Sequence, residues 1–208
     1  MLKVEGYAVP SVEQWALSIR GMRNPKNSWD RTDTLINREY GIELIEVGKN
    51  DLKLMKTLSD AGTEHRKYMR MLPVIVEINA PLYWWKEFDT YKVGTVANSC
   101  STMHKIASKQ FEIEDFSHEE LNEASLSCLL KTIECLNYHR KQYNEMKRKQ
   151  DWWQLIQLLP SSFNQKRTVM INYEVAMNIL RQRRNHKLTE WHTFCDFLEK
   201  LPYMKEFV

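Results

Sequence analysis

The stretch APLYWWKEFDTYKVGTVANSCSTM, residues 80–103, decides how the rest of the chain is interpreted. Two neighbouring tryptophans, Trp84 and Trp85, sit among charged residues, and a dense polar run with one glycine, Gly94, continues to His104. A purely structural segment of this length usually shows a cleaner apolar period. Aromatic and polar side chains mixed at this density indicate a lined pocket or an oligomer contact. A helix end and loop covered by its own hydroxyls is the alternative, and composition leaves both open.

The residues before this stretch predict a strand that leads into a helix. Residues 72–78 (LPVIVEI) are apolar and β-branched, which is typical of a strand. Pro73 places the start of that strand at an edge or at its first positions. Pro81 suits the first position of a helix, and that helix carries Trp84, Trp85 and Phe88.

The rest of the chain predicts a helix-rich α+β fold with a small, mostly antiparallel sheet, in one domain over residues 1–208. Further strands are expected at 2–9, 42–47 and within 161–172. Ser11 with Gln14, and Ser117 with Glu120, form capping boxes that predict helix starts. The second box is expected to begin the longest helix, which runs to about residue 149. Other helices are expected from 51 with Asn50 as N-cap, from 151, over 173–184 and from 189, the last one ending at Pro202. Gly21 is expected to end the helix that begins at Ser11, and residues 21–50 are expected to be polar and largely irregular.

The apolar positions predict which side of each helix faces the core. The inward residues expected for the helix after Ser11 are Trp15, Leu17 and Ile19, and those for the longest helix are Leu121, Leu129, Ile133 and Leu136. For the last two helices they are Val175, Ile179 and Leu180, and Trp191, Phe194, Phe197 and Leu198.

Composition excludes several functional classes. The net charge of +3, from 30 basic and 27 acidic residues, is too balanced to indicate nucleic-acid binding. No apolar run approaches the ~20 residues that span a bilayer, and residues 1–10 lack the apolar core of a signal peptide. Four cysteines without a CxxC pair favour reduced thiols in a cytoplasmic protein and no metal site.

Two basic clusters leave alternatives open. One is the group Arg20, Arg23, Lys26 and Arg31 beside Trp29, which would suit a phosphate but more commonly is a set of solvated loop charges. The other is the basic run at 140–149, for which the negative end of a helix dipole is the preferred explanation.

The order of three blocks of sequence indicates the family that the chain resembles. The apolar strand runs into residues 80–83 (APLY) and a charged aromatic helix, and Leu159-Pro160 is later followed by Thr168 and Asn172. The helix after Asn172 ends at Arg183, before a His-rich turn and a final helix. This order resembles the flavin-dependent thymidylate synthases over roughly residues 50–203.

The sequence departs from that family at its signature. Thr90-Tyr91-Lys92 stands where the family has Arg-His-Arg, and lysine does not replace a planar guanidinium. Relative to the family's Gln, Glu, Ser and Arg, the chain has, in that order, Glu87, Asn98, Cys100 and Thr102. Two further family arginines are replaced, by Ile156 and Glu174. Most of the family's anion clamp is therefore missing, although Asn172 and Arg183 remain.

The resemblance implies a homotetramer that binds FAD and a dUMP-like pyrimidine nucleotide and transfers a one-carbon unit to C5. Cys100 is the candidate nucleophile, and Tyr91 and His104 are candidates for proton transfer. The candidate nucleotide-binding residues are Glu87, Thr90, Lys92, Asn98, Thr102, Arg167 and Arg183. The candidate FAD-binding residues are Trp84, Asn172 and Asn178. Lys105 and Lys166 are further cations that would compensate for the lost arginines.

Two other functions stay open. One is a non-catalytic nucleotide-binding protein on the same scaffold, in which Tyr83, Trp84, Trp85 and Trp153 stack on a base. The other is an oligomer-forming structural protein. Neither membrane nor nucleic acid is an expected partner, and a lone cysteine in a Ser/Thr run is more often simply packed.

Overall fold

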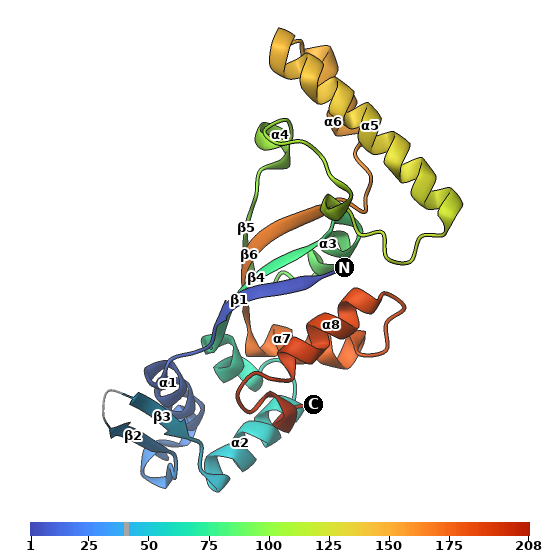
Figure 1. Cartoon of the computed structure of the whole chain (residues 1–208). Coiled ribbons are helices and arrows are strands. Elements are labelled where there is room, and N and C mark those ends of the chain that lie inside the picture. The colour runs from blue at the N-terminus through green and yellow to red at the C-terminus, as the bar shows by residue number, and fades with distance from the viewer. Residues whose placement is uncertain (40–41) are drawn as a thin grey trace. The chain divides into compact units, whose positions relative to one another are not determined.

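A computed structural model describes residues 1–39 and 42–208 of the chain (Figure 1). The chain forms two compact units, which are described separately. Unit 1 comprises residues 1–5, 77–91 and 97–168, and unit 2 comprises residues 6–76, 92–96 and 169–208. The expectation of a single domain stays a prediction.

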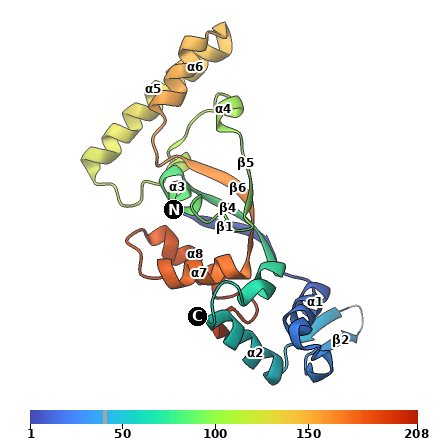
Figure 2. The same cartoon turned by 180° about the vertical axis from the view of Figure 1, so that it is seen from behind.

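The elements confirm the predicted α+β class, and Figures 1 and 2 show them from two sides. The strands are β1 (Lys3–Ala8), β2 (Leu35–Glu39), β3 (Ile42–Glu46), β4 (Pro73–Pro81), β5 (Val96–Ser99) and β6 (Asn164–Asn172). The helices are α1 (Val12–Arg23), α2 (Lys49–Asp60), α3 (Leu82–Phe88), α4 (Thr102–Lys105), α5 (Glu123–Met146), α6 (Lys149–Leu158), α7 (Tyr173–Arg183) and α8 (Thr189–Leu198). Short 3-10 helices are η1 (Asn24–Lys26), η2 (Trp29–Arg31), η3 (Arg66–Met71), η4 (Ile113–Asp115) and η5 (Met204–Glu206).

The main sheet has four strands in the order β1-β4-β6-β5. The strongest apolar run of the sequence and the strand-like residues after Pro160 therefore become its two central strands. The other sheet is the antiparallel hairpin of β2 and β3, in which Leu35 faces Glu46. Each strand of the main sheet crosses the boundary between the two units along the chain.

Helix α1 begins as predicted and ends later. The Ser11 hydroxyl accepts from the Gln14 amide, and the Gln14 side chain accepts from the Ser11 amide, which completes the capping box. The helix runs through Gly21 to Arg23. Leu17, expected on the apolar side, is 61% exposed, so that expectation is wrong.

Residues 21–50 were expected to be largely irregular, and the structure orders part of them around one carboxylate. Asp51 is fully buried and accepts from Arg23 Nε at 2.7 Å and from the Thr34 hydroxyl at 2.6 Å. The hydroxyl of Thr32 and the backbone amides of residues 33 and 34 complete its shell. The N-cap of α2 is Gly48 and not Asn50, and a Cβ there would lie 2.2–2.3 Å from Asp33 atoms.

The basic cluster at 20–31 is consequently divided. Arg23 is buried and paired with Asp51, with 2.6 Å between Arg23 Nη2 and Asp51 Oδ1. The guanidinium of Arg20 lies over the Trp29 ring at 5.0 Å. A phosphate at this cluster stays a prediction, and Arg23 already has a structural carboxylate partner.

The core of unit 2 is aromatic. The Trp15 ring meets the Tyr173 ring edge-on at 5.2 Å and the Tyr203 ring at 5.5 Å. Helices α7 and α8 contribute Ile179, Leu180 and the other residues expected on their inner faces, all of them buried. The sequence periodicity of these two helices was therefore a correct guide to their packing.

In unit 1 the longest helix starts five residues later than predicted. Its N-cap is Asn122, which accepts from the Ser125 amide at 2.9 Å. The Ser117 box does not start a helix, because the Ser117 hydroxyl donates to Asn164 Oδ1 at 2.9 Å instead. Leu121 is accordingly 40% exposed and lies outside the core.

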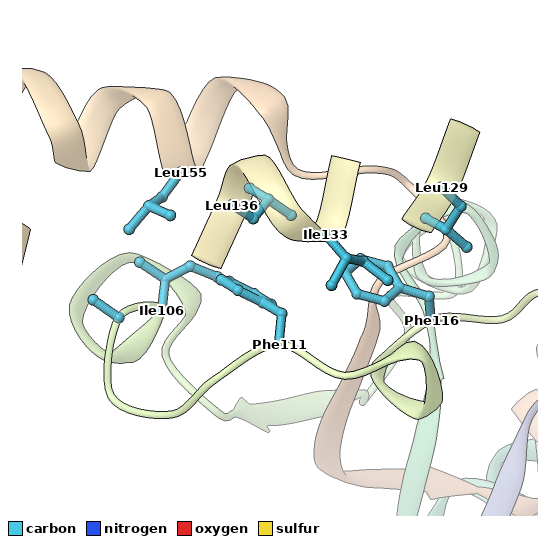
Figure 3. Packing of buried hydrophobic residues seen from close by; sticks show 8 residues of the cluster. Ile106, Phe111, Phe116, Leu129, Ile133, Leu136 and Leu155 are labelled. Atoms are coloured by element: carbon cyan, nitrogen blue, oxygen red, sulfur yellow. The ribbon is translucent and has the colours of Figure 1, made fainter. Parts of the chain in front are cut away.

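The predicted core face of α5 is confirmed. Leu129, Ile133 and Leu136 are buried against Leu155 of α6 and against the apolar residues of segment 106–116 (Figure 3). The segment therefore runs beneath the α5–α6 hairpin and joins it to one hydrophobic cluster. In the described part of the chain, no helix is long and apolar enough to cross a membrane.

Replacing Asp51 with asparagine is expected to destabilise the protein strongly. The change keeps the shape but leaves the Arg23 guanidinium buried without its counter-charge, so the free energy of unfolding falls by about 3–5 kcal/mol. Urea unfolding monitored by circular dichroism measures the loss. Asp30→Asn, an exposed carboxylate on η2, is the matched control and should change stability by less than about 0.5 kcal/mol.

The same pair gives a pH dependence. Burial opposes ionisation of Asp51, but hydrogen bonds from Thr32, Thr34 and Arg23 outweigh it and hold the pKa of Asp51 below its ordinary value. Because the folded pKa is lowered, the stabilisation is complete above the unfolded pKa of about 4 and disappears as the pH falls through the folded pKa. The stability difference between wild type and Asp51→Asn should shrink below about pH 4. An unchanged difference at pH 3 would contradict this assignment.

Candidate functional site

Unit 1 contains a cavity of about 250 Å³ at Cys100. It is lined by Asn79, Cys100, Ser101, Lys105, Ile106, Ser108, Lys109, Phe111, Asp115, Phe163, Asn164, Gln165 and Lys166. We call it the Cys100 cavity. Cys100 and Ser101 of the polar stretch at residues 80–103 contribute to its lining, and the other lining residues lie outside that stretch. The pocket expected for the stretch as a whole stays a prediction.

Strand pairing positions Cys100. This residue directly follows β5, and its amide donates to the Lys166 carbonyl of β6 at 3.0 Å. The Gln165 side chain donates back to the Cys100 carbonyl at 3.1 Å. These two bonds fix the backbone of Cys100 at the rim of the cavity, and its side chain is exposed.

Two asparagines supply amide groups that sequence reasoning missed. Asn79 lies near the end of β4, and Asn164 begins β6 with its Oδ1 accepting from Ser117. Each amide presents donors and an acceptor of the kind that match the edge of a nucleobase. The available signal was a polar residue at the end of a strongly apolar strand, but only the pairing of β4 with β6 shows that the two meet.

Lysines give the cavity a positive character. Lys105 forms no ion pair within the described residues. Lys109 is 2.6 Å from Asp115, and its hydrogen bond to that carboxylate raises the pKa of Lys109. Lys166 pairs with Glu5, which raises the pKa of Lys166 in the same way. Lys105 is therefore the cation best placed to meet an anionic ligand here.

Arg167, expected to hold a phosphate, does something else. Its Nε donates to Gln165 Oε1 at 2.9 Å, and its Nη1 donates to Asp89 at 2.8 Å. The guanidinium lies over the Trp85 ring at 4.3 Å. These contacts involve Nε, Nη1 and one face of the guanidinium, so Arg167 orients Gln165 and, through it, the backbone of Cys100. A phosphate contact of Arg167 stays a prediction.

The three candidate catalytic residues are not brought together. Cys100 lines the Cys100 cavity, whereas His104 lines a different one. Tyr91 lines neither, and its ring lies 6.4 Å from that of Phe88. Among the described residues, no side chain forms a hydrogen bond to the Cys100 thiol, which a nucleophile–base pair requires.

Two of the four aromatic residues expected to stack on a ligand belong to the core, whereas Tyr83 is half-buried and Trp153 is exposed. Trp84 is fully buried and stacks on Phe88 at 5.1 Å, and Trp85 is buried with its Nε1 donating to the Gln165 carbonyl at 2.9 Å. The prediction that these two rings stack on a base or flavin is therefore wrong. Adjacent residues of a helix point to different sides. The sequence alone therefore does not show that other residues cover both the Trp84 side and the Trp85 side of α3.

The predicted FAD-binding asparagines lie in unit 2 and make internal contacts. Asn172 caps α7 by accepting from the Val175 amide at 3.0 Å, and its Nδ2 donates to the Val93 carbonyl at 3.0 Å. Gly94 has φ +71°, and a Cβ there would lie 2.8 Å from that same Nδ2. Asn178 Oδ1 accepts from Arg66 at 3.4 Å.

The remaining candidates are spread over both units. The Thr90 hydroxyl donates to the Glu87 carbonyl at 2.7 Å, and Asn98 is exposed on β5. The side chain of Thr102 lies outside the described residues. In unit 2, Lys92 is exposed and Arg183 lies over the Trp191 ring at 5.0 Å.

Glu174, which replaces a family arginine, anchors a buried cluster in unit 2. It accepts from the Thr63 hydroxyl at 2.7 Å, forms an ion pair with Arg70, and lies 3.7 Å from Arg66. Burial opposes its ionisation, but the bonds from Arg70 and Thr63 prevail and hold the pKa of Glu174 below its ordinary value. The charge at this position is therefore reversed and compensated within the fold.

Thiols and metals add no further chemistry. Cys100, Cys128, Cys135 and Cys195 are free, and burial raises the pKa of the Cys195 thiol to about 11. Within residues 1–39 and 42–208, no group of His, Cys, Asp and Glu is arranged to hold a metal ion.

Comparison with known proteins identifies the fold. No protein-family model and no curated protein sequence matches the chain. Two solved structures of the flavin-dependent thymidylate synthase ThyX from Helicobacter pylori, each complexed with FAD and dUMP, are similar to it in structure. One has a TM-score of 0.66 at 17% identity and covers 99% of this chain and 97% of its own. The other has a TM-score of 0.65 at 18% identity, with 99% and 95% covered.

The chain has the fold of the flavin-dependent thymidylate synthases. The resemblance found in the sequence is thereby confirmed at the level of fold, over nearly the whole chain and not only residues 50–203.

Arg167→Lys tests the structural role assigned to Arg167. Lysine cannot reproduce the planar fork or the stacking on Trp85, so the free energy of unfolding should fall by about 1–3 kcal/mol. Asp89→Asn removes only the exposed end of the same network and should cost less than about 1 kcal/mol. Equal effects of the two variants in chemical denaturation would show that Arg167 is not the centre of this network.

Proposed function

We propose that the protein binds a pyrimidine nucleoside monophosphate, with the ring in the Cys100 cavity. One observation carries the proposal. Cys100 stands where the resemblance places the serine beside the pyrimidine, and it lines a cavity that combines amides with Lys105, which forms no ion pair with the residues that the structure describes. The fold likeness to two enzymes complexed with dUMP supports the same ligand class.

The lining of the cavity suits such a ligand. Asn79 and Asn164 offer donors and acceptors for the ring edge, and Phe111 and Phe163 give an apolar wall. The ammonium of Lys105 supplies a charge for the phosphate. Lys105 and the two asparagines would replace some of the ligand contacts that the resemblance assigns to arginines. Because these residues lie at other positions of the chain, the nucleotide would bind in a shifted pose.

FAD belongs to the proposal through the fold likeness, since both ThyX structures are complexed with FAD. A homotetramer belongs to it only through the resemblance found in the sequence. The side chains expected to hold FAD do not fit that role. Trp84 is in the core, and Asn172 and Asn178 already have partners within unit 2. No reaction step is therefore derived through the flavin, and binding of the nucleotide is the function that the geometry supports best.

Transfer of a one-carbon unit to C5 of the pyrimidine is the second candidate. The exposed Cys100 thiol on the cavity favours it, because a thiolate adds readily to an activated double bond. Its addition to C6 moves the C5–C6 π electrons onto C5 and the C4 carbonyl. C5 then bonds to the methylene carbon of an iminium-type one-carbon donor, whose π electrons move onto nitrogen, or in the absence of a donor it takes up a proton from solvent. Loss of the original C5 proton then returns electrons to the C5–C6 bond and expels the Cys100 thiolate from C6.

Nucleotide binding is measured by calorimetry with dUMP and other nucleoside monophosphates. The expected result is saturable binding that Lys105→Ala weakens by about tenfold or more, because a charge-assisted contact contributes about 1.5–3 kcal/mol. Lys131→Ala on the exposed face of α5 is the matched control. Absence of binding for every nucleotide tested, or equal losses in the two variants, contradicts the proposal.

Deuterium exchange at C5 of dUMP separates the binder from the enzyme. Addition and expulsion of the Cys100 thiolate would exchange the C5 proton with solvent without flavin or a one-carbon donor, and Cys100→Ala would abolish it. Proton NMR of dUMP in D2O measures the exchange. Lys166 interacts electrostatically with Cys100, but among the described residues no side chain is hydrogen-bonded to the thiol as a base. We therefore expect binding without exchange, and Cys100-dependent exchange would establish the enzyme instead.

A further inference from the structure

A second, larger cavity of unit 1 lies at the turn between α5 and α6 and has a volume of about 610 Å³. It is lined by Met103, His104, Ile106, Ala107, Tyr143, Lys147, Lys149 and Trp152. We call it the Lys147 cavity. Its volume falls in the range of about 300–1,000 Å³ that is typical of small-molecule sites.

The walls of the Lys147 cavity are held by specific bonds. Trp152 Nε1 donates to the Met103 carbonyl at 3.1 Å, and Asn144 Nδ2 donates to the Ala107 carbonyl at 3.0 Å. Ile106 of the wall packs with Leu155 and Leu136 in the hydrophobic cluster beneath the hairpin (Figure 3). The cavity is therefore fixed to the core of unit 1.

The cavity is positively charged. Lys147 and Lys149 are exposed, and neither forms an ion pair with any residue that the structure describes. The neighbouring carboxylate, Asp151, is already bound by Arg148 at 2.8 Å and lies 3.4 Å from His139 Nδ1. No carboxylate among the described residues therefore occupies the ammonium groups of Lys147 and Lys149, and both can contact an anion.

The helix dipole accounts for a positive charge at Lys147 but not at Lys149. Lys147 caps the C-terminus of α5 at φ 53°, with its amide donating to the Tyr143 carbonyl at 2.8 Å, so a cation there is favourable. Lys149 is the first residue of α6, at the positive end of that helix, where a cation is unfavourable. A bound anion between the two lysines would remove this conflict.

Aromatic side chains complete the lining. Tyr143 and Trp152 are partly buried, and the Lys147 ammonium lies 5.4 Å from the centre of the Tyr143 ring. Partly buried rings present flat apolar faces suited to a planar ligand, and lysine is a common point-charge ligand of phosphate. A phosphate and a flat ring on one molecule satisfy both features.

We propose that the Lys147 cavity binds the phosphate monoester of a planar ring compound about the size of a nucleoside monophosphate. Lys147 and Lys149 bind the phosphate, and Tyr143 and Trp152 contact the ring. This site is separate from the Cys100 cavity, although Ile106 lines both, and it does not depend on the function proposed for Cys100.

The test is calorimetric titration of the full-length chain carrying Lys105→Ala, which weakens the proposed phosphate contact at the Cys100 cavity. The probes are phenyl phosphate, uridine 5′-monophosphate, uridine and inorganic phosphate. Both ring phosphates should bind, and uridine and inorganic phosphate should each bind at least about tenfold more weakly, because each lacks one half of the recognition. Adding Lys147→Ala and Lys149→Ala should weaken the ring phosphates by at least about tenfold per lysine.

The control adds Lys131→Ala and Lys141→Ala, which remove the same charge from exposed positions of α5 and should leave affinity unchanged. Equal losses in the control and test variants would reduce the effect to net charge and overturn the proposal. Inorganic phosphate binding as tightly as phenyl phosphate, or binding restricted to oligonucleotides, would also overturn it. Failure of dUMP to bind at the Cys100 cavity leaves these expectations unchanged, so the two proposals fail separately.

Discussion

The pairing of β5 with β6 is the constraint on which the Cys100 cavity depends. The amide of Cys100 bonds to the Lys166 carbonyl, and Gln165 returns a bond to the Cys100 carbonyl. Arg167 then holds Gln165 while stacked on buried Trp85. The polar segment is thereby fixed to the aromatic core of α3, and a short strand with only exposed side chains keeps a defined position.

The interior of this protein contains two buried carboxylates in ion pairs, an arrangement that the family signature does not predict. Glu174 stands in place of an arginine, and Arg70 and Arg66 approach it from η3. Asp51 is likewise satisfied by Arg23 and two threonine hydroxyls. Both carboxylates are retained because each has a complete set of donors, and the cations that pair with them are thereby removed from ligand binding.

Local patterns predicted the elements well, and long-range pairings decided the site. The strand at 72–78, the Ser11 capping box and the inner faces of α5 and α7 follow from residue spacing alone. The false helix start at Ser117 arose because its hydroxyl has a partner 47 residues away in Asn164. Trp84 was misassigned, and the contacts of Arg167 with Gln165, Asp89 and Trp85 were not foreseen, because the partners of a side chain across the sheet cannot be read from the sequence.

The replaced signature and the positions of the cations support one interpretation. Cys100 replaces a serine but has no base beside it among the described residues, and His104 faces the other cavity. Most of the arginines that the resemblance implies are replaced, although Arg183 remains, and Lys105, Lys147 and Lys149 line cavities without carboxylate partners in the described chain. The cavities therefore present ammonium groups, while Cys100, His104 and Tyr91 line no common cavity, and this arrangement is the basis of the proposal that the protein binds anionic rings. The stretch at residues 80–103 contributes to it through Cys100, whose backbone is held in place by the pairing of β5 with β6.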